Sequence, residues 1–220
     1  MTTTLKLTAG KRPFGRTGLN VTPLGFGGAP IGLLESEAEA VGDVLNELLD
    51  AGVNLIDTAA CYYGSEEAIG KAVSNRRDEY ILVSKCGHNV DKDGRADFSP
   101  EVITESIDRS LKRLKTDRLD VILLHSCDLE TLKKGEALAA AVKAREAGKV
   151  RFVGYSGDNE AAEWAVQQED VAVLQTSVNV CDQRNIDDVL PLAQKNKVGV
   201  MVKRPIANAA WRPLKEQYEK

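Results

Sequence analysis

Short apolar runs alternate with longer amphipathic segments along most of the chain. Residues 53–57 form an apolar run that ends in an acid, which predicts a buried strand whose C-terminal end reaches solvent. Directly before this run, apolar residues recur at helical spacing over residues 41–49, and Gly52 closes the predicted helix. This part of the chain therefore predicts an amphipathic helix followed by a buried strand.

The same alternation repeats along the chain. Further strands are predicted at residues 24–27, 80–84, 119–124, 150–155, 171–176 and 198–203, and further helices at residues 65–73, 99–114, 129–148, 158–166 and from residue 187. Strands joined in this way need right-handed crossovers, so the units curl toward an α/β barrel of the (β/α)8 TIM type that lacks its eighth βα unit. An open doubly wound sheet has the same alternation, so periodicity alone leaves both folds open.

Composition supports one domain over residues 1–220, with a β-hairpin at about residues 12–21 and βα units over about residues 24–220. A net charge of -4 with scattered Lys and Arg gives no electrostatic footprint for nucleic acid or an anionic membrane. No apolar stretch approaches the roughly 20 residues that span a bilayer, and residues 1–10 lack the apolar core of a signal peptide. We therefore expect a cytoplasmic protein that binds neither nucleic acid nor membrane.

Two glycine-rich stretches are similar to nucleotide-binding motifs without matching them. In residues 25–32, Pro30 stands where a dinucleotide fingerprint requires its third glycine. Residues 64–71 are one residue too long for a phosphate loop, and Ala72 replaces its Ser or Thr. Neither motif supports nucleotide binding.

Four polar residues fall at or just after the C-terminal ends of three predicted strands. Asp57 ends one strand, Tyr62 lies five positions further on, Lys85 follows the next strand, and His125 follows the one after. Because the C-terminal strand ends of a barrel meet at one mouth, these side chains are expected to converge. Taken singly, an Asp after a strand is usually a helix cap and a Lys in a loop is usually solvated, so the combination carries the prediction.

This set of side chains fits the reduction of an aldehyde or ketone, which needs a hydride on carbon and a proton on oxygen. A tyrosine with a pKa near 10 holds its proton, and the ammonium of Lys85 is expected to bring Tyr62 toward useful acidity. Asp57 would keep Lys85 charged, and His125 would hydrogen-bond the carbonyl oxygen and orient it. The sequence therefore predicts a reductase of small carbonyl compounds.

Six stretches resemble the aldo-keto reductase family, and together they span nearly the whole chain. They are FGRTGLNVTPLGFGG at residues 14–28, NLIDTAACYYGSEEAIG at 54–70, YILVSKCG at 80–87, LDVILLHS at 119–126, GKVRFVGYS at 148–156 and VMVKRPIA at 200–207. The resemblance implies a (β/α)8 barrel, and a nicotinamide cofactor that is usually NADPH, with NAD not excluded. It also implies a catalytic tetrad of Asp57, Tyr62, Lys85 and His125, because Tyr62 rather than Tyr63 has the family's five-residue offset from the aspartate.

The same resemblance assigns residues to cofactor binding. The implied set is Gly28, Asp57, Ser156, Gln175, Lys203 and Arg204. In the family, Ser156 and Gln175 correspond to residues that lie against the nicotinamide carboxamide. Lys203 or Arg204 stands where many members stack an aromatic ring on the nicotinamide. Gly157 departs from the asparagine that usually follows the serine, which removes one contact to the carboxamide.

The chain has four cysteines and no CxxC pair, which favours reduced thiols over a disulfide framework. Cys61, Cys86 and Cys127 fall just after predicted strands, as does His88, so a soft metal ion among them is an alternative. Their spacing matches no zinc finger, and cysteine commonly lines pockets. We therefore predict no metal site, and two histidines hardly support a metal-dependent hydrolase.

The C-terminal part lacks the pattern of an eighth unit. Residues 214–219 are charged and helix-like, whereas the family resemblance implies a loop that grips the adenosine 2′-phosphate. A naturally short protein, a fragment and a sequence with omitted segments are the three explanations. A naturally short barrel would expose strand edges, which predicts a homo-oligomer and weak cofactor binding. The alternative function is a catalytically silent barrel that acts as a cofactor sensor or regulatory subunit.

Overall fold

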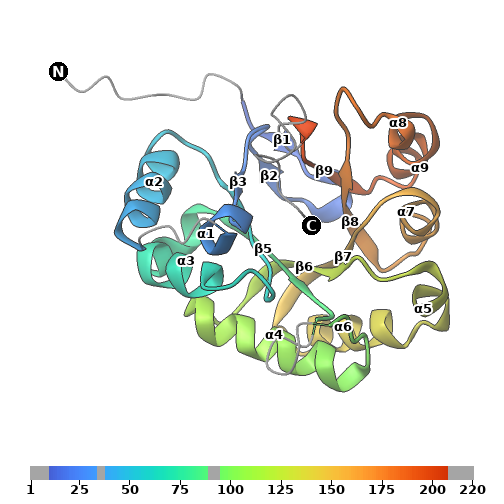
Figure 1. The fold of residues 1–220 in the computed structure, drawn as a ribbon, viewed down its shortest axis with the longest axis horizontal. Helices are drawn as coiled ribbons and strands as arrows, with labels where there is room; N and C mark the ends of the chain where they lie inside the picture. The colour runs from blue at the N-terminus through green and yellow to red at the C-terminus, as the bar shows by residue number, and fades with distance from the viewer. Residues whose placement is uncertain (1–9, 34–37, 89–94, 208–220) are drawn as a thin grey trace.

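Seven parallel strands form one curled sheet in the computed structural model, which describes residues 10–33, 38–88 and 95–207 (Figure 1). Each strand pairs with the next one in chain order, from β3 to β9. The strands are β3 (Phe26–Gly27), β4 (Leu55–Asp57), β5 (Ile81–Cys86), β6 (Leu119–His125), β7 (Val150–Ser156), β8 (Val171–Ser177) and β9 (Gly199–Lys203). This sequential order excludes the doubly wound sheet, whose strand order reverses, and confirms the prediction of a TIM-barrel type sheet without an eighth strand among the described residues.

Helices connect the strands and cover the outer, convex side of the sheet (Figure 1). They are α1 (Ala29–Leu33), α2 (Ala38–Asp50), α3 (Ser65–Val73), η2 (Ser74–Glu79), α4 (Pro100–Leu114), α5 (Leu129–Lys134), α6 (Glu136–Glu146), α7 (Asn159–Ala165), α8 (Arg184–Asp188) and α9 (Leu190–Lys195). In the described part of the chain, no helix is long and apolar enough to cross a membrane.

An antiparallel hairpin precedes the sheet, as the sequence predicts. It joins β1 (Arg12–Pro13) to β2 (Asn20–Val21) through the 3-10 turn η1 (Gly15–Thr17), and Gly18 turns the chain with a left-handed φ of 71°. The backbone N–H of Arg16 donates to the carbonyl of Lys197 at 2.7 Å, and its guanidinium donates to the carbonyl of Glu169 at 2.7 Å. Because these acceptors lie just before β9 and β8, the hairpin sits at the N-terminal end of the sheet.

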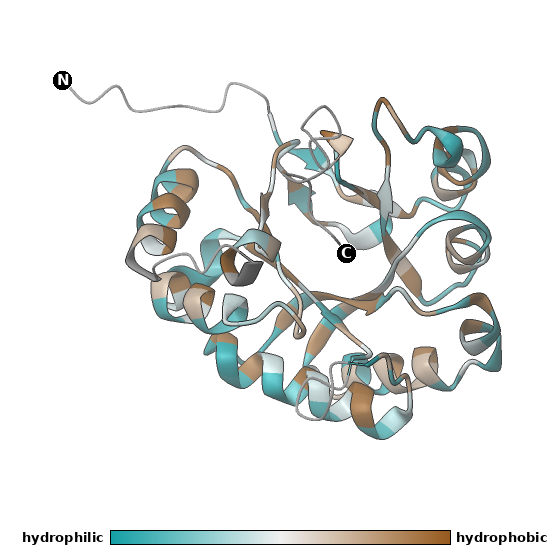
Figure 2. Cartoon of the chain, viewed as in Figure 1, coloured by the Kyte–Doolittle hydropathy of each residue, from teal (hydrophilic) through white to brown (hydrophobic). Residues whose placement is uncertain are grey.

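Side chains of the strands alternate between two apolar layers. In β5, Ile81 and Val83 lie in the inner layer, whereas Leu82 packs in the layer between sheet and helices. Figure 2 shows apolar stretches along the strands and a mixture of polar and apolar residues on the surrounding helices. Alternation continues to the strand end, so Lys85 shares the inward face of Ile81 and Val83, and Cys86 does not.

Several boundaries differ from the prediction. The segment 129–148, predicted as one helix, is divided into α5 and α6 by Gly135, whose φ of 80° cannot continue an α-helix. The predicted strand 24–27 is paired only at Phe26–Gly27, and the helix predicted from residue 187 begins at Arg184. The helix-like segment 214–219 lies outside the described residues.

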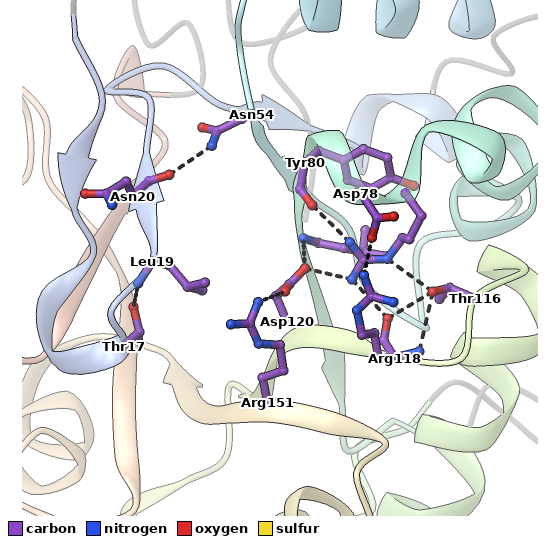
Figure 3. A network of polar contacts seen from close by, with 12 residues as sticks. Thr17, Leu19, Asn20, Asn54, Asp78, Tyr80, Thr116, Arg118, Asp120 and Arg151 are labelled. Atoms are coloured by element: carbon purple, nitrogen blue, oxygen red, sulfur yellow. Dashed lines mark hydrogen bonds and ion pairs between the residues drawn. The ribbon is translucent and has the colours of Figure 1, made fainter.

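A polar network occupies the N-terminal ends of β5, β6 and β7 (Figure 3). The side chain of Asp120, 4% exposed, accepts hydrogen bonds from Arg77 at 2.7 Å and Arg151 at 2.8 Å. It also accepts one from the backbone N–H of Leu82 at 2.9 Å, which ties β6 to β5. An open cavity of about 400 Å³ borders the network. It lies at the end of the strands opposite to the four predicted catalytic residues.

Candidate active site

The C-terminal ends of β4, β5 and β6 carry three of the four predicted catalytic side chains. Asp57 and His125 are the last residues of their strands, and Lys85 is the penultimate residue of β5. Lys85 pairs in register with Leu123, two positions before His125 on the same face of β6. Tyr62 follows β4 in a short turn in which its N–H donates to the carbonyl of Ala59 at 3.0 Å.

Lys85 holds its charge in a nearly closed environment. The residue is 1% exposed, and its Nζ donates to Asp57 Oδ1 at 2.7 Å and to the carbonyl of Thr58 at 2.8 Å. Burial alone would lower the pKa of Lys85, but the negative charge of Asp57 and the phenol of Tyr62 outweigh burial and raise it. Lys85 is therefore a fixed cation at the mouth of the sheet.

The two adjacent tyrosines lie in different environments. Tyr62 is partly buried, with Lys85 Nζ 4.8 Å from its ring centroid and the His125 ring centroid 5.9 Å away in an edge-on arrangement. Tyr63 is 88% exposed. Of the two candidates, Tyr62 is the one that lies with Lys85 and His125.

The acidity of Tyr62 differs from the expectation. Burial raises the pKa of Tyr62 above its ordinary value, and the opposing effect of the Lys85 charge is smaller. Asp57 adds to the rise because it favours the neutral phenol. In the structure the phenol therefore keeps its proton at neutral pH, and Lys85 limits the rise of the pKa without reversing it.

His125 is an uncharged imidazole in this site. Burial, followed by the positive charge of Lys85, lowers its pKa to about 2. Its Nδ1 lies 3.3 Å from the sulfur of Cys61, and its ring centroid is 4.9 Å from that of His88. Burial raises the pKa of the Cys61 thiol and lowers that of His88.

Cys61 and His88 are thus neighbours of the predicted tetrad, which the sequence reasoning did not foresee. It grouped them with Cys86 and Cys127, and both of these lie in the layer between sheet and helices. The period-2 alternation in β5 was the available signal, because it directs Cys86 away from the face that carries Lys85. The loop positions of Cys61 and His88 carry no such periodic signal.

Ser156 and Gln175 lie side by side at the ends of β7 and β8. They are paired in register, and Ser156 Oγ donates to Gln175 Oε1 at 3.0 Å in a buried position. His125 is paired in register with Ser156, so the three residues stand at one level. At Gly157, a Cβ would lie 2.5 Å from Cζ of Tyr155, so an asparagine would require the Tyr155 ring to move.

The side chains of Lys203 and Arg204 both lie close to the carboxylate of Asp158. Lys203 Nζ lies 3.2 Å from Asp158 Oδ2, and Arg204 donates to Ser177 Oγ at 3.1 Å. Asp158 also accepts hydrogen bonds from the backbone N–H of Ser177 at 2.7 Å and from Thr176 at 2.8 Å. Asp158 is the N-cap residue of α7, but its side chain makes no capping hydrogen bond.

Gly28 lies next to the end of β4. Its N–H donates to the carbonyl of Asp57 at 2.7 Å, and Ser65 Oγ donates to its carbonyl at 3.0 Å. A Cβ at this position would lie 2.6 Å from Ser65 Oγ, so the close packing requires glycine. Gly28 therefore contributes backbone, without a side chain, to the neighbourhood of Asp57.

Residues 23–219 match the model of the Aldo/keto reductase family. Among curated proteins, L-galactose dehydrogenase of Arabidopsis thaliana is 32% identical over 211 residues, which cover 89% of this chain and 65% of that protein. The NADH-specific methylglyoxal reductase of Escherichia coli is 26% identical over 218 residues, with coverage of 89% and 67%. The chain spans about two thirds of the length of these relatives.

Solved structures show the same similarity. A putative aldo-keto reductase from Pseudomonas aeruginosa superposes with a TM-score of 0.83 and 32% identity, over 92% of this chain and 80% of that one. An aldo-keto reductase from Bacillus halodurans in its holo form gives a TM-score of 0.84 and 29% identity, over 94% and 71% of the two chains. The four predicted catalytic residues all lie within the matched segment 23–219.

Proposed function

The chain belongs to the aldo/keto reductase family, and from this premise we propose that it reduces an aldehyde or ketone to an alcohol with hydride from NADPH. The observation that carries the proposal is the contact of Lys85 with both Asp57 and Tyr62 beside His125. These groups lie together at the C-terminal ends of parallel strands, where barrel enzymes carry their active sites, and this placement supports a catalytic role.

In the proposed reaction Tyr62 is the proton donor. Its phenol holds the proton at neutral pH and releases it as negative charge develops on the carbonyl oxygen. Lys85 Nζ stabilises the phenolate that remains, since it lies against the Tyr62 ring and its own charge is held by Asp57. The proton is then restored to Tyr62 from solvent.

His125 is proposed to orient the substrate. A neutral imidazole offers one N–H, and the contact between Cys61 Sγ and Nδ1 favours a hydrogen on Nε2 when the thiol donates. That N–H would donate to the carbonyl oxygen and hold it within reach of Tyr62. His125 would thus position the oxygen without exchanging a proton itself.

A bound nicotinamide would supply the hydride, and two buried side chains fit its carboxamide. Ser156 and Gln175 offer a hydroxyl and an amide, which together can donate to and accept from such a group. Lys203, Arg204 and Gly28 are proposed to complete the cofactor site. NADPH is proposed on the family resemblance, and NAD is not excluded because one relative is described as NADH-specific.

The test compares two adjacent phenols. We expect Tyr62→Phe to lower kcat by about 100-fold or more, because general acid catalysis contributes roughly 10²–10⁴. Tyr63→Phe removes the same hydroxyl from an exposed neighbour and is expected to keep wild-type turnover. Oxidation of NADPH, and of NADH in parallel, is followed with a panel of small aldehydes and ketones.

Two results would contradict this proposal. Equal turnover of the Tyr62→Phe and wild-type proteins would remove Tyr62 from catalysis. Cofactor binding without turnover on any carbonyl compound would favour the alternative, a silent barrel that acts as a cofactor sensor or regulatory subunit.

The remaining predictions concern the whole protein. We propose that residues 1–220 form a single domain, and that the protein is cytoplasmic with a small carbonyl compound as its partner. Binding to nucleic acid or membrane is not expected. If the whole protein lacks an eighth unit, we also propose a homo-oligomer, because β3 and β9 each have one edge without a strand partner among the described residues.

A further inference from the structure

Three potential metal ligands meet beside the proposed proton donor. Cys61, His88 and His125 each offer one ligand atom, and these three atoms lie within 4.8 Å of one another. Cys61 Sγ and His125 Nδ1 are already 3.3 Å apart. That separation is about the ligand–ligand distance of a tetrahedral zinc ion, whose bonds are about 2.3 Å to sulfur and 2.0–2.1 Å to nitrogen.

His88 has a ring nitrogen that is available to bind a ligand. Its Nδ1 is buried without a hydrogen-bond partner among the described residues. A buried polar atom without a partner costs free energy, which a ligand at that atom would recover. A rotation of the His88 side chain that brings its ligand atom closer to the other two would complete a set of three ligands with zinc spacing.

The chemical type of the three ligands indicates which metal ion the site would bind. One thiolate and two imidazoles suit zinc and other soft or borderline ions, whereas magnesium and calcium prefer oxygen ligands. Three protein ligands with water in the fourth position are the usual coordination of catalytic zinc ions. All three residues are partly exposed, so an ion can reach them from solvent.

Three cations lie near the site, Lys85, Lys203 and Arg204, and two carboxylates partly offset their charge. Lys85 is paired with Asp57 at 2.7 Å, and Lys203 is paired with Asp158 at 3.2 Å. Ligation would release the thiol proton of Cys61 to solvent and add a negative charge at the ion. The ion and its thiolate together add one positive charge to the site, instead of the two that an ion bound by neutral ligands alone would add.

We propose that Cys61, His88 and His125 form a binding site for one Zn²⁺ ion. A bound ion occupies His125 and the space beside Tyr62, so zinc inhibits carbonyl reduction by competing with the carbonyl substrate. This inhibition rests on the proposed function, whereas binding of the ion does not.

The test measures binding directly on the 220-residue chain. Zinc chloride is titrated against a chromophoric chelator with the metal-free protein, and one ion per chain is expected. Cys61→Ser and His88→Ala are each expected to weaken binding by about 100-fold or more, because loss of an outer partner alone costs about 10–100-fold. Cys181→Ser, which removes an exposed thiol elsewhere, is the matched control and keeps wild-type affinity.

Substitution with Co²⁺ gives a second readout that does not depend on affinity. A sulfur-to-cobalt charge-transfer band is expected in the wild-type protein and absent in Cys61→Ser, with folding of each variant checked by circular dichroism. Equal zinc affinity in the wild-type, Cys61→Ser and His88→Ala proteins, or no zinc binding at all, would overturn the site. Zinc binding by a protein that reduces no carbonyl compound would sink the proposed function alone.

Discussion

Asp158 is a carboxylate whose hydrogen bonds hold the end of β8. Burial alone would raise its pKa, but the hydrogen bond from the backbone N–H of Ser177 and the charge of Lys203 outweigh burial and lower it. A carboxylate with a lowered pKa stabilises the folded state above the unfolded pKa, near 3.8. That stabilisation is lost as the pH falls through the folded pKa.

The prediction compares the wild-type protein with Asp158→Asn. At pH 7 the variant is expected to have a lower free energy of unfolding, because Lys203 loses its ion pair. The difference is expected to shrink once the pH falls below about 4, where the carboxyl of the unfolded chain takes up a proton, and to be lost as the pH falls through the lower pKa of the folded carboxyl. Urea unfolding at a series of pH values measures both effects, and a difference that stays constant from pH 7 to pH 3 would contradict the role of this carboxylate.

The sequence predicts the positions of some residues of the candidate site and not of others. Asp57, Lys85 and His125 follow apolar runs, so their positions at strand ends are readable, and their proximity in the structure agrees with that expectation. Cys61 and His88 lie in loops, whose paths depend on tertiary packing. The net rise of the Tyr62 pKa also depends on burial, which sequence does not quantify.

Among the elements, α3 and α4 approach each other closely at Gly70. A Cβ at this position would overlap the carbonyl of Arg113 and lie 2.8 Å from Cα of Leu114. Both obstacles are backbone atoms, so they cannot rotate away as a side chain would. In α2, by contrast, a Cβ at Gly42 would meet only Ala72 Cβ, at an ordinary 3.6 Å.

These two helical glycines predict opposite effects of one substitution. Gly70→Ala is expected to lower the free energy of unfolding by about 1–3 kcal/mol, the usual cost of overpacking. Gly42→Ala is expected to raise it by about 0.5–1 kcal/mol, because alanine restricts the unfolded chain and favours the helix. Thermal unfolding of both variants provides the measurement, and stabilisation by Gly70→Ala would show that α3 can move away from α4.

The strands from β4 onward could be predicted from their apolar runs, whereas two of the shortest helices could not. The strands from β4 to β9 lie within two residues of their predicted bounds. The helices α1 and η2 were missed because five or six residues carry too little period-3.6 signal. Gly135 was read as part of a helix because apolar residues continue on both sides of it.

At the scale of the whole molecule, the network around Asp120 (Figure 3) links the N-terminal ends of three strands, opposite to the candidate site. Asp120 lies in β6, and its carboxylate accepts hydrogen bonds from Leu82 in β5 and Arg151 in β7. Asp78 forms an ion pair with Arg118 in the same network, but its side chain is 90% exposed. Asp120 and Asp78 thus both pair with arginine, but only Asp120 is buried.

Asp120→Ala is expected to lower the free energy of unfolding by about 3–5 kcal/mol, since two arginines lose a buried partner. Asp78→Ala is expected to change it by less than about 1 kcal/mol, as for other exposed pairs. Denaturant unfolding compares the two variants. Similar losses in both would mean that burial does not determine the strength of this network.

The two-sided packing of β5 has a consequence for redesign of this protein. Deleting one residue between Ile81 and Ser84 would reverse the inward and outward positions in the rest of β5. The thiol of Cys86 would then point into the candidate site in place of the ammonium of Lys85. The displaced amine would then face the helices among hydrocarbon side chains. Changes in the connecting loops do not alter which strand residues point inward. New substrate preferences are therefore best sought in the loops, with the strand lengths conserved.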